Sequence, residues 1–322
     1  MRRLIATTTV VVLGACQDRT PTAPTTDLSA PLATASRPRG GPPVIGCGER
    51  CNRIAFVREG DPEHQGYPTI YSIKPDGTGL TPVLWLALQP TWSPNHQKLA
   101  FKRKYSNPDG IGTINPDGTG LTMLTFEPDD QDPKFSPDGT KIVFARRTTA
   151  GTMDLWIMNQ DGTQQAPITN TPGYSEYQPD FSPDGKKLVY VTGANGGLNL
   201  DIAVLDLATL TSTIISASPH YELSPSWSPD GNRIAFQTGI AGPNTACIAM
   251  VDPNGKNRTE INPNGNPCSQ PSWSPDSKSV AFRSQANGLS LILQATISNN
   301  VPIAYALVTK TQYIDSDPAW AR

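Results

Sequence analysis

The sequence predicts an all-β fold, a six-bladed β-propeller with four-stranded antiparallel blades. Three observations predict it: a thirteen-residue unit aligns five times without gaps, its copies lie 43 to 46 residues apart, and tight turns separate short alternating strands. A fixed period of this length with four strands per repeat is typical of propellers, in which radial repetition leaves only short sheet edges. The copies begin at residues 89, 132, 178, 224 and 270, and their shared aromatic positions are Trp92, Phe135, Phe181, Trp227 and Trp273.

The copy at 132–144, "DPKFSPDGTKIVF", predicts the first two strands of a blade. A short strand ends at Phe135, and Ser-Pro-Asp-Gly then reverses the chain, because proline presets φ and glycine accepts a positive φ. An alternating second strand follows, and "DLWIMN" (154–159) predicts the third strand after a variable loop. A second turn, "NQDGTQ" (159–164), leads into a short fourth strand. We expect each aromatic side chain to pack between adjacent blades.

A sixth copy is split between the two ends of the chain. The chain ends in "DPAWAR", which places Trp320 47 residues after Trp273, and the second strand that this copy lacks is found at 52–56 as "NRIAF". We therefore expect a C-terminal strand over 317–321 to pair with N-terminal strands that begin near Arg53. This pairing would close the ring and remove the open sheet edge.

The segment before the repeats predicts export and tethering. Residues 1–15 have the basic start and short apolar run of a signal peptide, and Leu13 to Cys16 resembles the lipobox of bacterial lipoproteins. We expect cleavage before Cys16 and lipidation of that residue; an ordinary signal peptide with a coincidental cysteine is the alternative. Residues 16–46 are rich in Thr, Pro and Ala and predict a disordered tether, with the propeller over 47–322. The expected location is the cell envelope, anchored to the periplasmic side of the outer membrane.

Composition limits the partners and the redox state. With 26 Lys and Arg against 28 Asp and Glu, the net charge of −2 argues against nucleic-acid binding. Beyond Cys16 an even number of cysteines remains, which favours disulfides in an exported protein. Their spacing suggests the pairs Cys47 with Cys51 and Cys247 with Cys268. A zinc site is disfavoured because no histidine lies near the C-x3-C segment.

The repeated units carry a family resemblance. The pattern P-x-[W/F]-S-P-D-G with its following alternating strand, and the N-x-D-G-T-x turns, resemble the TolB-type WD40-like (PD40) propeller repeats over residues 50–322. TolB proteins have an α/β domain before the propeller, where this sequence predicts a tether. The resemblance implies a scaffold or binding function, and family members commonly bind partner peptides or a calcium ion at the mouth of the channel.

Acidic residues recur where the loops enter the first strand of each blade. The third residue before the repeat's proline is acidic in four of six copies, and the residue just before proline is acidic in two. Because we expect the first strand to be innermost, these groups would surround the channel mouth and attract cations or basic peptide segments. The candidate partner-binding residues are Asp130, Asp132, Glu176, Glu222, Asp315 and Asp317. As an alternative, acids before proline are solvated turn-formers.

Basic residues follow the second strands on the same face and predict a rim of mixed charge around the acids: Arg58, Lys102, Arg103, Lys104, Arg146 and Arg147. Three tyrosines in the neighbouring loops are candidate contact anchors, and covering blade edges is the alternative: Tyr174, Tyr177 and Tyr221.

These features predict a monomeric, non-enzymatic envelope protein that recognises a protein or peptide at the acidic face, with Ca²⁺ as an alternative ligand there. The rival class is a propeller hydrolase or lyase that acts on a glycan or small molecule in the channel. The chain has three histidines and no G-x-S-x-G or H-E-x-x-H motif. Two acids of the ring could form a glycosidase pair, depending on their separation.

Overall fold

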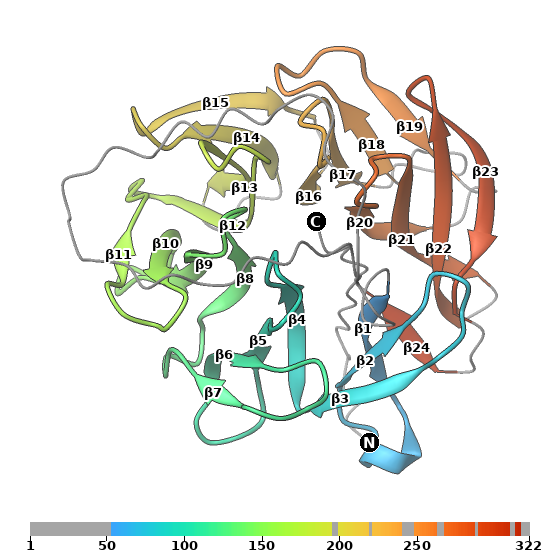
Figure 1. The fold of residues 1–322 in the computed structure, drawn as a ribbon. Coiled ribbons are helices and arrows are strands. Elements are labelled where there is room, and N and C mark those ends of the chain that lie inside the picture. The colour runs from blue at the N-terminus through green and yellow to red at the C-terminus, as the bar shows by residue number, and fades with distance from the viewer. Residues whose placement is uncertain are drawn as a thin grey trace, which may run out of the picture.

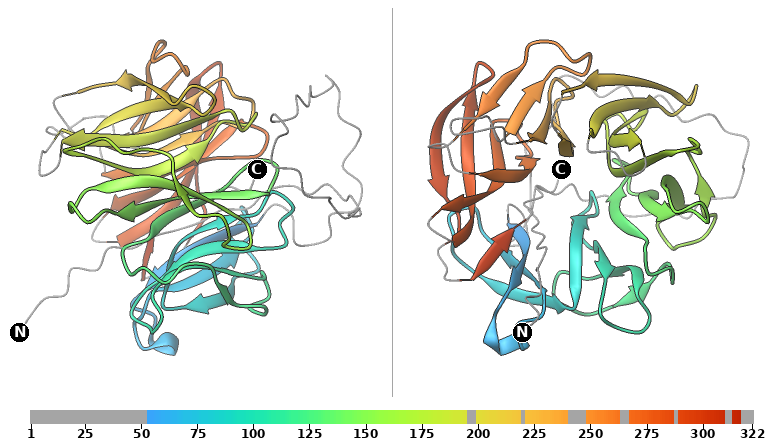
Figure 2. Two further views of the ribbon diagram at one scale, coloured as in Figure 1. Left: turned by 90° about the vertical axis from the view of Figure 1, so that its left-hand side faces the viewer. Right: turned by 180° about the vertical axis from the view of Figure 1, so that it is seen from behind.

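A computed structural model describes residues 53–194, 199–218, 221–239, 248–262, 267–286, 289–309 and 313–316. Strands dominate these residues, and they are arranged as sheets around a central axis (Figure 1). The two turned views in Figure 2 show the same arrangement from the side and from behind. The prediction of an all-β propeller is therefore confirmed. One short 3-10 helix, η1 (Pro62–His64), lies in the loop after β1.

Four sheets each contain four antiparallel strands that follow one another in the chain. Sheet I comprises β4 (Ala87–Trp92), β5 (Leu99–Arg103), β6 (Gly110–Ile114) and β7 (Thr122–Met123). Sheet II comprises β8 (Gln131–Phe135), β9 (Lys141–Arg147), β10 (Met153–Asn159) and β11 (Ala166–Pro167). Sheet III comprises β12 (Tyr174–Phe181), β13 (Lys187–Ala194), β14 (Asp201–Asp206) and β15 (Thr211–Ser216). Sheet IV comprises β16 (Glu222–Trp227), β17 (Ile234–Thr238), β18 (Ile248–Val251) and β19 (Thr259–Ile261).

The remaining strands form one eight-stranded sheet, so the structure has four separate blades and a larger curled sheet where the sequence predicts two further blades. Its first part comprises β20 (Cys268–Trp273), β21 (Ser279–Ala286), β22 (Leu289–Ser298) and β23 (Val301–Leu307). Its second part comprises β24 (Ile314–Ser316), β1 (Ile54–Glu59), β2 (Thr69–Ile73) and β3 (Thr81–Trp85). The two parts merge because β22 and β24 pair in parallel at Ser290 and Ile314. The sequence predicts six separate blades, whereas the strand pairing gives four separate blades and one larger sheet.

A C-terminal strand does pair with the N-terminal strand. β24 lies antiparallel to β1, with Arg58 opposite Asp315 and Val57 opposite Ser316. The sequence places this strand at 317–321, and those residues lie outside the described part of the chain. Pairing through 314–316 covers the edge that β1 would otherwise expose.

The hydrophobic core is divided into clusters that lie between neighbouring sheets. One cluster joins Val143 and Leu155 of sheet II to Phe181 and Leu188 of sheet III, and the others repeat this arrangement around the ring. The five described aromatics of the repeat belong to these clusters and are buried: Trp92, Phe135, Phe181, Trp227 and Trp273. The prediction that these aromatics pack between adjacent sheets is confirmed. Trp320 lies outside the described residues.

The Ser-Pro-Asp-Gly turns close the first hairpin of each sheet. At 136–139 the Ser136 hydroxyl donates to Asp138 Oδ1 at 2.5 Å and accepts from the Lys141 N–H at 2.9 Å. Gly139 has a φ of 73° and donates its N–H to the Ser136 carbonyl. The same contacts recur in the other copies, two of which have His96 and Ser277 with positive φ in place of the glycine. The shared contacts explain why Ser-Pro-Asp/Asn is repeated at these hairpins.

Each first strand contains a β-bulge at the residue before the repeat's proline. The register shifts in all five described copies, for example between Gln131 and Lys134. The bulged residues have left-handed backbones with φ between 47° and 57°: Gln89, Asp132, Gln178, Ser224 and Gln270. A bulge adds one residue to one strand and so reverses which side chains share a face on the two sides of it.

Several predictions lie outside the described residues. They are the signal peptide, the tether, lipidation at Cys16, and the disulfide candidates Cys47, Cys51 and Cys247. Cys268 is buried at the start of β20, and its pairing with Cys247 stays a prediction. Across the described residues, no helix has the length and apolar character needed to cross a membrane.

Candidate functional site

The first strands β4, β8, β12, β16 and β20 lie nearest the axis of the ring (Figure 1), and neighbouring first strands contact one another. Two repeat positions meet where these strands begin. Position A is the third residue before the repeat's proline, and position B is the second residue after the aromatic of the second strand. The A and B residues are Ala87 and Arg103, Asp130 and Arg146, Glu176 and Thr192, Glu222 and Thr238, Cys268 and Ser284, and Asp315 and Arg58.

In two copies positions A and B form a buried ion pair. Arg146 donates from Nε and Nη2 to the two carboxylate oxygens of Asp130, at 2.7 and 2.6 Å. Arg58 donates in the same way to Asp315, at 2.8 and 3.0 Å. Both carboxylates are fully buried. Burial raises the pKa of Asp315 and the Arg58 hydrogen bonds oppose that rise, whereas the hydrogen bonds to Asp130 raise the pKa of Arg146.

In two other copies a glutamate at position A faces a threonine at position B. Glu176 and Glu222 are buried, and Oε2 of each has no hydrogen-bond partner among the described residues. Oε1 of Glu222 accepts from the Ser216 hydroxyl at 2.8 Å and lies 3.5 Å from Arg258 Nη1. Burial raises the pKa of both glutamates, and the nearby carboxylates of Asp154 and Asp201 add to the rise.

A second set of side chains, which we call the belt, links the sheets through the bulged residues Gln89, Asp132, Gln178 and Ser224. Gln89 donates from Nε2 to Asp132 Oδ1 at 2.6 Å and accepts the Asp132 N–H at Oε1, at 3.1 Å. Asp132 Oδ2 then accepts the Gln178 N–H at 3.3 Å, and Gln178 Oε1 accepts the Ser224 N–H at 2.8 Å. The side chains of Gln89, Asp132 and Gln178 therefore each bind the bulged backbone of the next sheet.

Asp132 is the charged member of the belt. Burial raises its pKa to about 6, although the Gln178 N–H stabilises the ionised form. Left-handed backbone at a residue other than glycine is unusual and often marks a functional site. The belt residues repeat this left-handed conformation around the axis, and their polar side chains are half-buried or buried. Together they form a polar collar, held by hydrogen bonds, at the start of the first strands.

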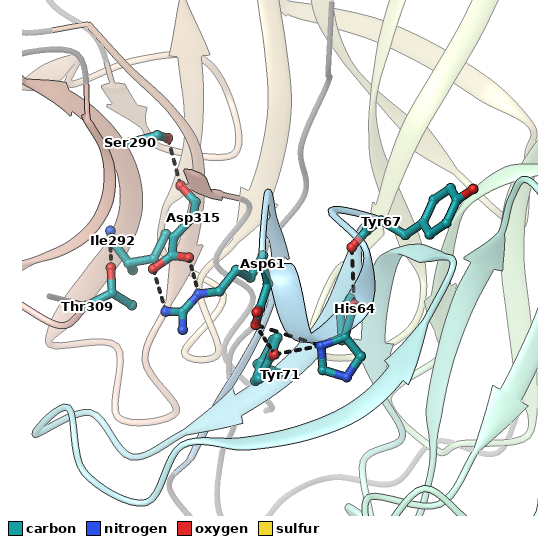
Figure 3. A network of polar contacts seen from close by, with 10 residues as sticks. Asp61, His64, Tyr67, Tyr71, Ser290, Ile292, Thr309 and Asp315 are labelled. Carbon is teal, nitrogen blue, oxygen red and sulfur yellow. Dashed lines mark hydrogen bonds and ion pairs between the residues drawn. The ribbon is translucent and has the colours of Figure 1, made fainter. Parts of the chain in front are cut away.

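A third polar cluster lies beside the Arg58–Asp315 pair (Figure 3). Tyr71 donates its hydroxyl hydrogen to Asp61 and lies 3.0 Å from His64 Nδ1, which is 3.7 Å from Asp61 Oδ2. Burial and the Asp61 contact raise the pKa of Tyr71. Burial opposes the shift of Asp61, but the hydrogen bonds from Tyr71 and the Glu63 N–H leave its pKa lowered. Arg58 also lies over the rings of Phe56 and Tyr71 at 5.1 and 5.2 Å.

The predicted basic rim is largely engaged within the protein. Arg58 and Arg146 are the buried partners described above, and Lys102 donates to the carbonyls of Pro128 and Asp130. Arg147 forms an exposed ion pair with Asp129 at 2.8 Å. Of the three candidate anchor tyrosines, Tyr174 and Tyr221 are exposed, and Tyr177 packs against the cores on both sides of sheet III.

The structure places the predicted acids differently from an exposed ring. Asp130, Glu176, Glu222 and Asp315 are buried, and their partners are arginines and hydroxyls. Third-strand carboxylates lie near enough to the two glutamates to raise their pKa. Asp132 alone of the described acids joins the belt, and Asp317 lies outside the described residues. Sequence reasoning missed the amides Gln89 and Gln178. The signal for them is present, since glutamine precedes the repeat's proline in three of the six copies, Gln270 being the third.

Among the described residues, no group of three or more His, Cys, Asp or Glu side chains is arranged to hold a metal ion. Binding of Ca²⁺ by this face stays a prediction.

The comparisons with known proteins bear on the repeat pattern. The family described as the TolB beta propeller domain (PD40) matches residues 154–321, which is more than half of the chain. The chain belongs to this family. The predicted TolB-like resemblance is thereby confirmed. No curated protein matches the chain.

Solved structures agree on the fold. TolB from Acinetobacter baumannii is similar with a TM-score of 0.70 and 21% identity, over 85% of this chain and 67% of that one. A protein assigned as TolB from Agrobacterium tumefaciens gives a TM-score of 0.63 and 19% identity, over 76% and 90%. An oligogalacturonate lyase in complex with manganese gives 0.54 and 16%, over 80% and 72%. At these identities the likeness establishes a TolB-like propeller fold, which hosts more than one function.

Proposed function

We propose that this TolB-family propeller is a non-enzymatic binding protein that recognises a protein or peptide segment at the face where the first strands begin. The observation that carries the proposal is the belt. Its side chains are polar, half-buried to buried, and held in place by hydrogen bonds to the next sheet. A collar fixed before binding loses little conformational freedom when a partner docks, which favours affinity.

The predicted acids support this face in different ways. Asp130 and Asp315 fix the arginines beside the first strands, and Glu176 and Glu222 fill the equivalent positions in sheets III and IV. Asp132, and in this proposal Asp317, contribute to the contact surface itself. Tyr174 and Tyr221 are exposed aromatic side chains near the same strand starts and suit contact anchors.

Crosslinked pull-down from envelope extract tests the proposal. The binding variant is Gln89→Ala combined with Gln178→Ala, and the matched control is Lys186→Ala combined with Lys278→Ala, which changes exposed turn residues at the opposite ends of sheet III and the large sheet. We expect the control to keep the partners of the wild type and the belt variant to lose at least one of them. A belt variant that is folded and keeps every partner would contradict the proposed face.

A second candidate function is a propeller lyase or hydrolase that acts on a glycan or small molecule. Two observations favour it: the fold is shared with an oligogalacturonate lyase, and Tyr71, His64 and Asp61 form a proton-bearing cluster near the face. A panel of polysaccharide and lactone substrates, with and without added Mn²⁺ or Ca²⁺, tests it. Turnover that disappears in His64→Gln, with folding intact, would replace the binding proposal by this one.

We further propose that the ring has six blades, with the large sheet acting as two. Its two parts contain four strands each, and they share a core of Phe56, Tyr71, Ala281 and Ile292 that resembles the cores between the other sheets. A single parallel pair at Ser290 and Ile314 joins them. An experimental structure tests this count by the course of the chain between β23 and β24.

The envelope location also belongs to the proposal. A lipidated Cys16 and a tether over 16–46 would hold a monomeric propeller on the periplasmic side of the outer membrane, with disulfides Cys47–Cys51 and Cys247–Cys268. Incorporation of labelled palmitate into the wild type but not into Cys16→Ala, followed by membrane fractionation, tests the anchor. Mass spectrometry of peptides from the non-reduced protein tests the disulfides.

A further inference from the structure

Three repeat copies place an arginine at position B, but only two of them supply a carboxylate at position A. The arginines are Arg58, Arg103 and Arg146, each two residues after the aromatic of its second strand. Arg58 and Arg146 bind Asp315 and Asp130 through both carboxylate oxygens. Opposite Arg103 in the register of sheet I stands Ala87, which is fully buried and has no polar side chain.

The hydrogen bonds of Arg103 differ accordingly. Its Nε, which binds a carboxylate oxygen in the other two arginines, donates to the Ser106 hydroxyl at 2.9 Å. Its Nη1 is buried and has no hydrogen-bond partner among the residues that the structure describes. Within the described part of the chain, Arg103 takes part in no salt bridge, and the nearby carboxylate of Asp109 accepts the Ser106 N–H. A partly buried guanidinium is thus left with a neutral partner.

We propose that Arg103 is a receptor for a carboxylate on a ligand, specifically an aspartate or glutamate side chain of an extended peptide. A ligand carboxylate would give Arg103 the charged partner that Asp130 and Asp315 provide inside the protein. Hydrogen bonds between arginine and carboxylate are charge-assisted and about twice as strong as neutral ones. The planar fork of arginine matches a carboxylate, and the two internal examples show that the backbone at this repeat position accommodates one.

The surroundings of Arg103 fit an acidic peptide. Backbone hydrogen bonds join Ala87 to Pro68 at 3.4 Å and Lys104 to Leu86 at 3.1 Å, which tie three loops together beside the arginine. Lys104 adds a second positive charge and lies over the Tyr105 ring at 5.2 Å. Tyr105 and Tyr67, from two of these loops, are 58% and 41% exposed and offer apolar contact area next to the charges.

This inference rests on the proposed binding function and names the chemistry of one contact. It also differs from the predicted attraction of basic segments to an acidic ring, because the acids at position A are buried and this cation is without a charged partner in the described structure. The sheet I sector of the face therefore favours an acidic ligand.

The test follows the arginine Nε–Hε NMR signals of the full-length protein during titration with the peptide acetyl-Gly-Asp-Gly-amide. Acetyl-Gly-Asn-Gly-amide is the neutral control. We expect the Arg103 signal, assigned through Arg103→Lys, to shift saturably with the aspartate peptide only. Equal shifts with both peptides, or no shift with either, would overturn the proposal.

Protein variants sharpen the test. Ala87→Asp installs the internal carboxylate of the other copies and should weaken binding about tenfold or more, as expected for loss of a charge-assisted hydrogen bond. Ala87→Asn adds nearly the same volume without charge and should weaken it less. Thermal unfolding verifies that both variants are folded. If Ala87→Asp is not, Arg103→Gln replaces it, and binding of the aspartate peptide, followed by isothermal titration calorimetry in wild type and variant, should be lost. Undiminished binding to folded Ala87→Asp would refute the assignment.

The outcome is separable from the pull-down that tests the binding face. Peptide binding by wild type with an unchanged partner set in the belt variant would retain Arg103 as a carboxylate site and reject the belt. Loss of partners in the belt variant without any Arg103 response would retain the face and reject the acidic contact.

Discussion

Arg146 and Asp130 form a two-point ion pair, with Nε–Oδ1 and Nη2–Oδ2 distances of 2.7 and 2.6 Å, at the point where the first strand of sheet II begins. The carboxylate is fully buried and the guanidinium side chain is 16% exposed. Arg146 also lies over the rings of Phe144 and Trp156 at 5.1 and 4.8 Å. The pair therefore joins the first, second and third strands of the sheet.

Asp130→Ala should destabilise the protein strongly, because it leaves the arginine without its charged partner. Breaking one side of a buried ion pair costs about 3 to 5 kcal/mol. The neighbouring pair of Arg147 and Asp129 has side chains that are 52% and 59% exposed, and it provides the control. Asp129→Ala should cost less than about 1 kcal/mol. Urea unfolding measures both, and equal losses would show that the buried pair has no special role.

The register of this pair explains what sequence reasoning could and could not find. The turn at 136–139 and the pairing of Phe135 with Ile142 follow from the Ser-Pro-Asp-Gly pattern. Continued without a bulge, that register would place Asp130 opposite Arg147. The bulge at Asp132 shifts it by one residue, so that Asp130 meets Arg146. A left-handed residue before proline carries no composition signal of its own, and the sequence consequently predicts that the acids line the channel mouth, where the structure buries most of them against internal partners.

The strand pattern and the aromatic spacing are sufficient to predict the propeller fold, because both reflect contacts within one repeat and between adjacent repeats. The merging of the two four-stranded parts depends instead on how β22 approaches β24 at Ser290 and Ile314. β22 is the third strand of its part and β24 is the first strand of the other, so the two strands occupy different positions in the repeat. The alternation of polar and apolar residues within a strand shows which face is buried, but it does not show which strands of different repeats pair. The belt likewise depends on side chains reaching the next sheet, 43 to 46 residues away, as Gln89 reaches Asp132 and Gln178 reaches Ser224.

Asp132 should make the folded state less stable at neutral pH than at mildly acidic pH. Its pKa is raised to about 6 in the fold, against about 3.9 in an unfolded chain. Below pH 4 the carboxyl is protonated in both states. Between about pH 4 and 6 the unfolded state ionises first, so stability falls as pH rises, by about 3 kcal/mol in total.

Asp132→Asn removes this titration. We expect the free energy of unfolding of the variant to change less between pH 4 and 7 than that of the wild type, with the difference confined to that window. Asp138→Asn is a turn control, since hydrogen bonds from Ser136 and Thr140 offset the effect of burial and leave the pKa of Asp138 lowered. Identical pH profiles for wild type and Asp132→Asn would contradict the raised pKa.

The left-handed backbone of the belt should reverse the usual order of alanine and glycine in a strand. Gln178 has a φ of 53°, and its Oε1 accepts the Ser224 N–H. Gln178→Ala and Gln178→Gly both lose that acceptor, at about 1 to 3 kcal/mol. Glycine lacks the Cβ that disfavours positive φ, so Gln178→Gly should be the more stable of the two by about 1 kcal/mol. Thermal unfolding of the pair measures the difference, and a more stable alanine variant would argue against this backbone.

Removal of β24 should loosen β1 before the rest of the ring. β24 pairs with Val57, Arg58 and Glu59, and Ser290 donates its hydroxyl hydrogen to the Asp315 carbonyl at 2.7 Å. A chain that ends at residue 313 loses these contacts and exposes an unpaired strand edge. We expect faster amide hydrogen exchange in 54–59 than in β9 or β13 of the same protein. Uniform exchange across the three strands would show that closure does not depend on β24.

Trp227 should tolerate phenylalanine far better than alanine. Its side chain is buried between sheets III and IV, with its Nε1–H donating to the Gly231 carbonyl at 3.3 Å. Two equivalent positions, Phe135 and Phe181, carry phenylalanine in the same kind of intersheet core, so an aromatic ring without the indole N–H already fits this setting.

Trp227→Ala leaves a cavity between two sheets and should cost about 3 to 5 kcal/mol. Trp227→Phe should cost less than half of that, since it keeps most of the ring contacts and removes one long hydrogen bond. Urea unfolding compares the two variants, and similar losses would mean that the indole group itself, more than the filling of the space between the sheets, stabilises this core.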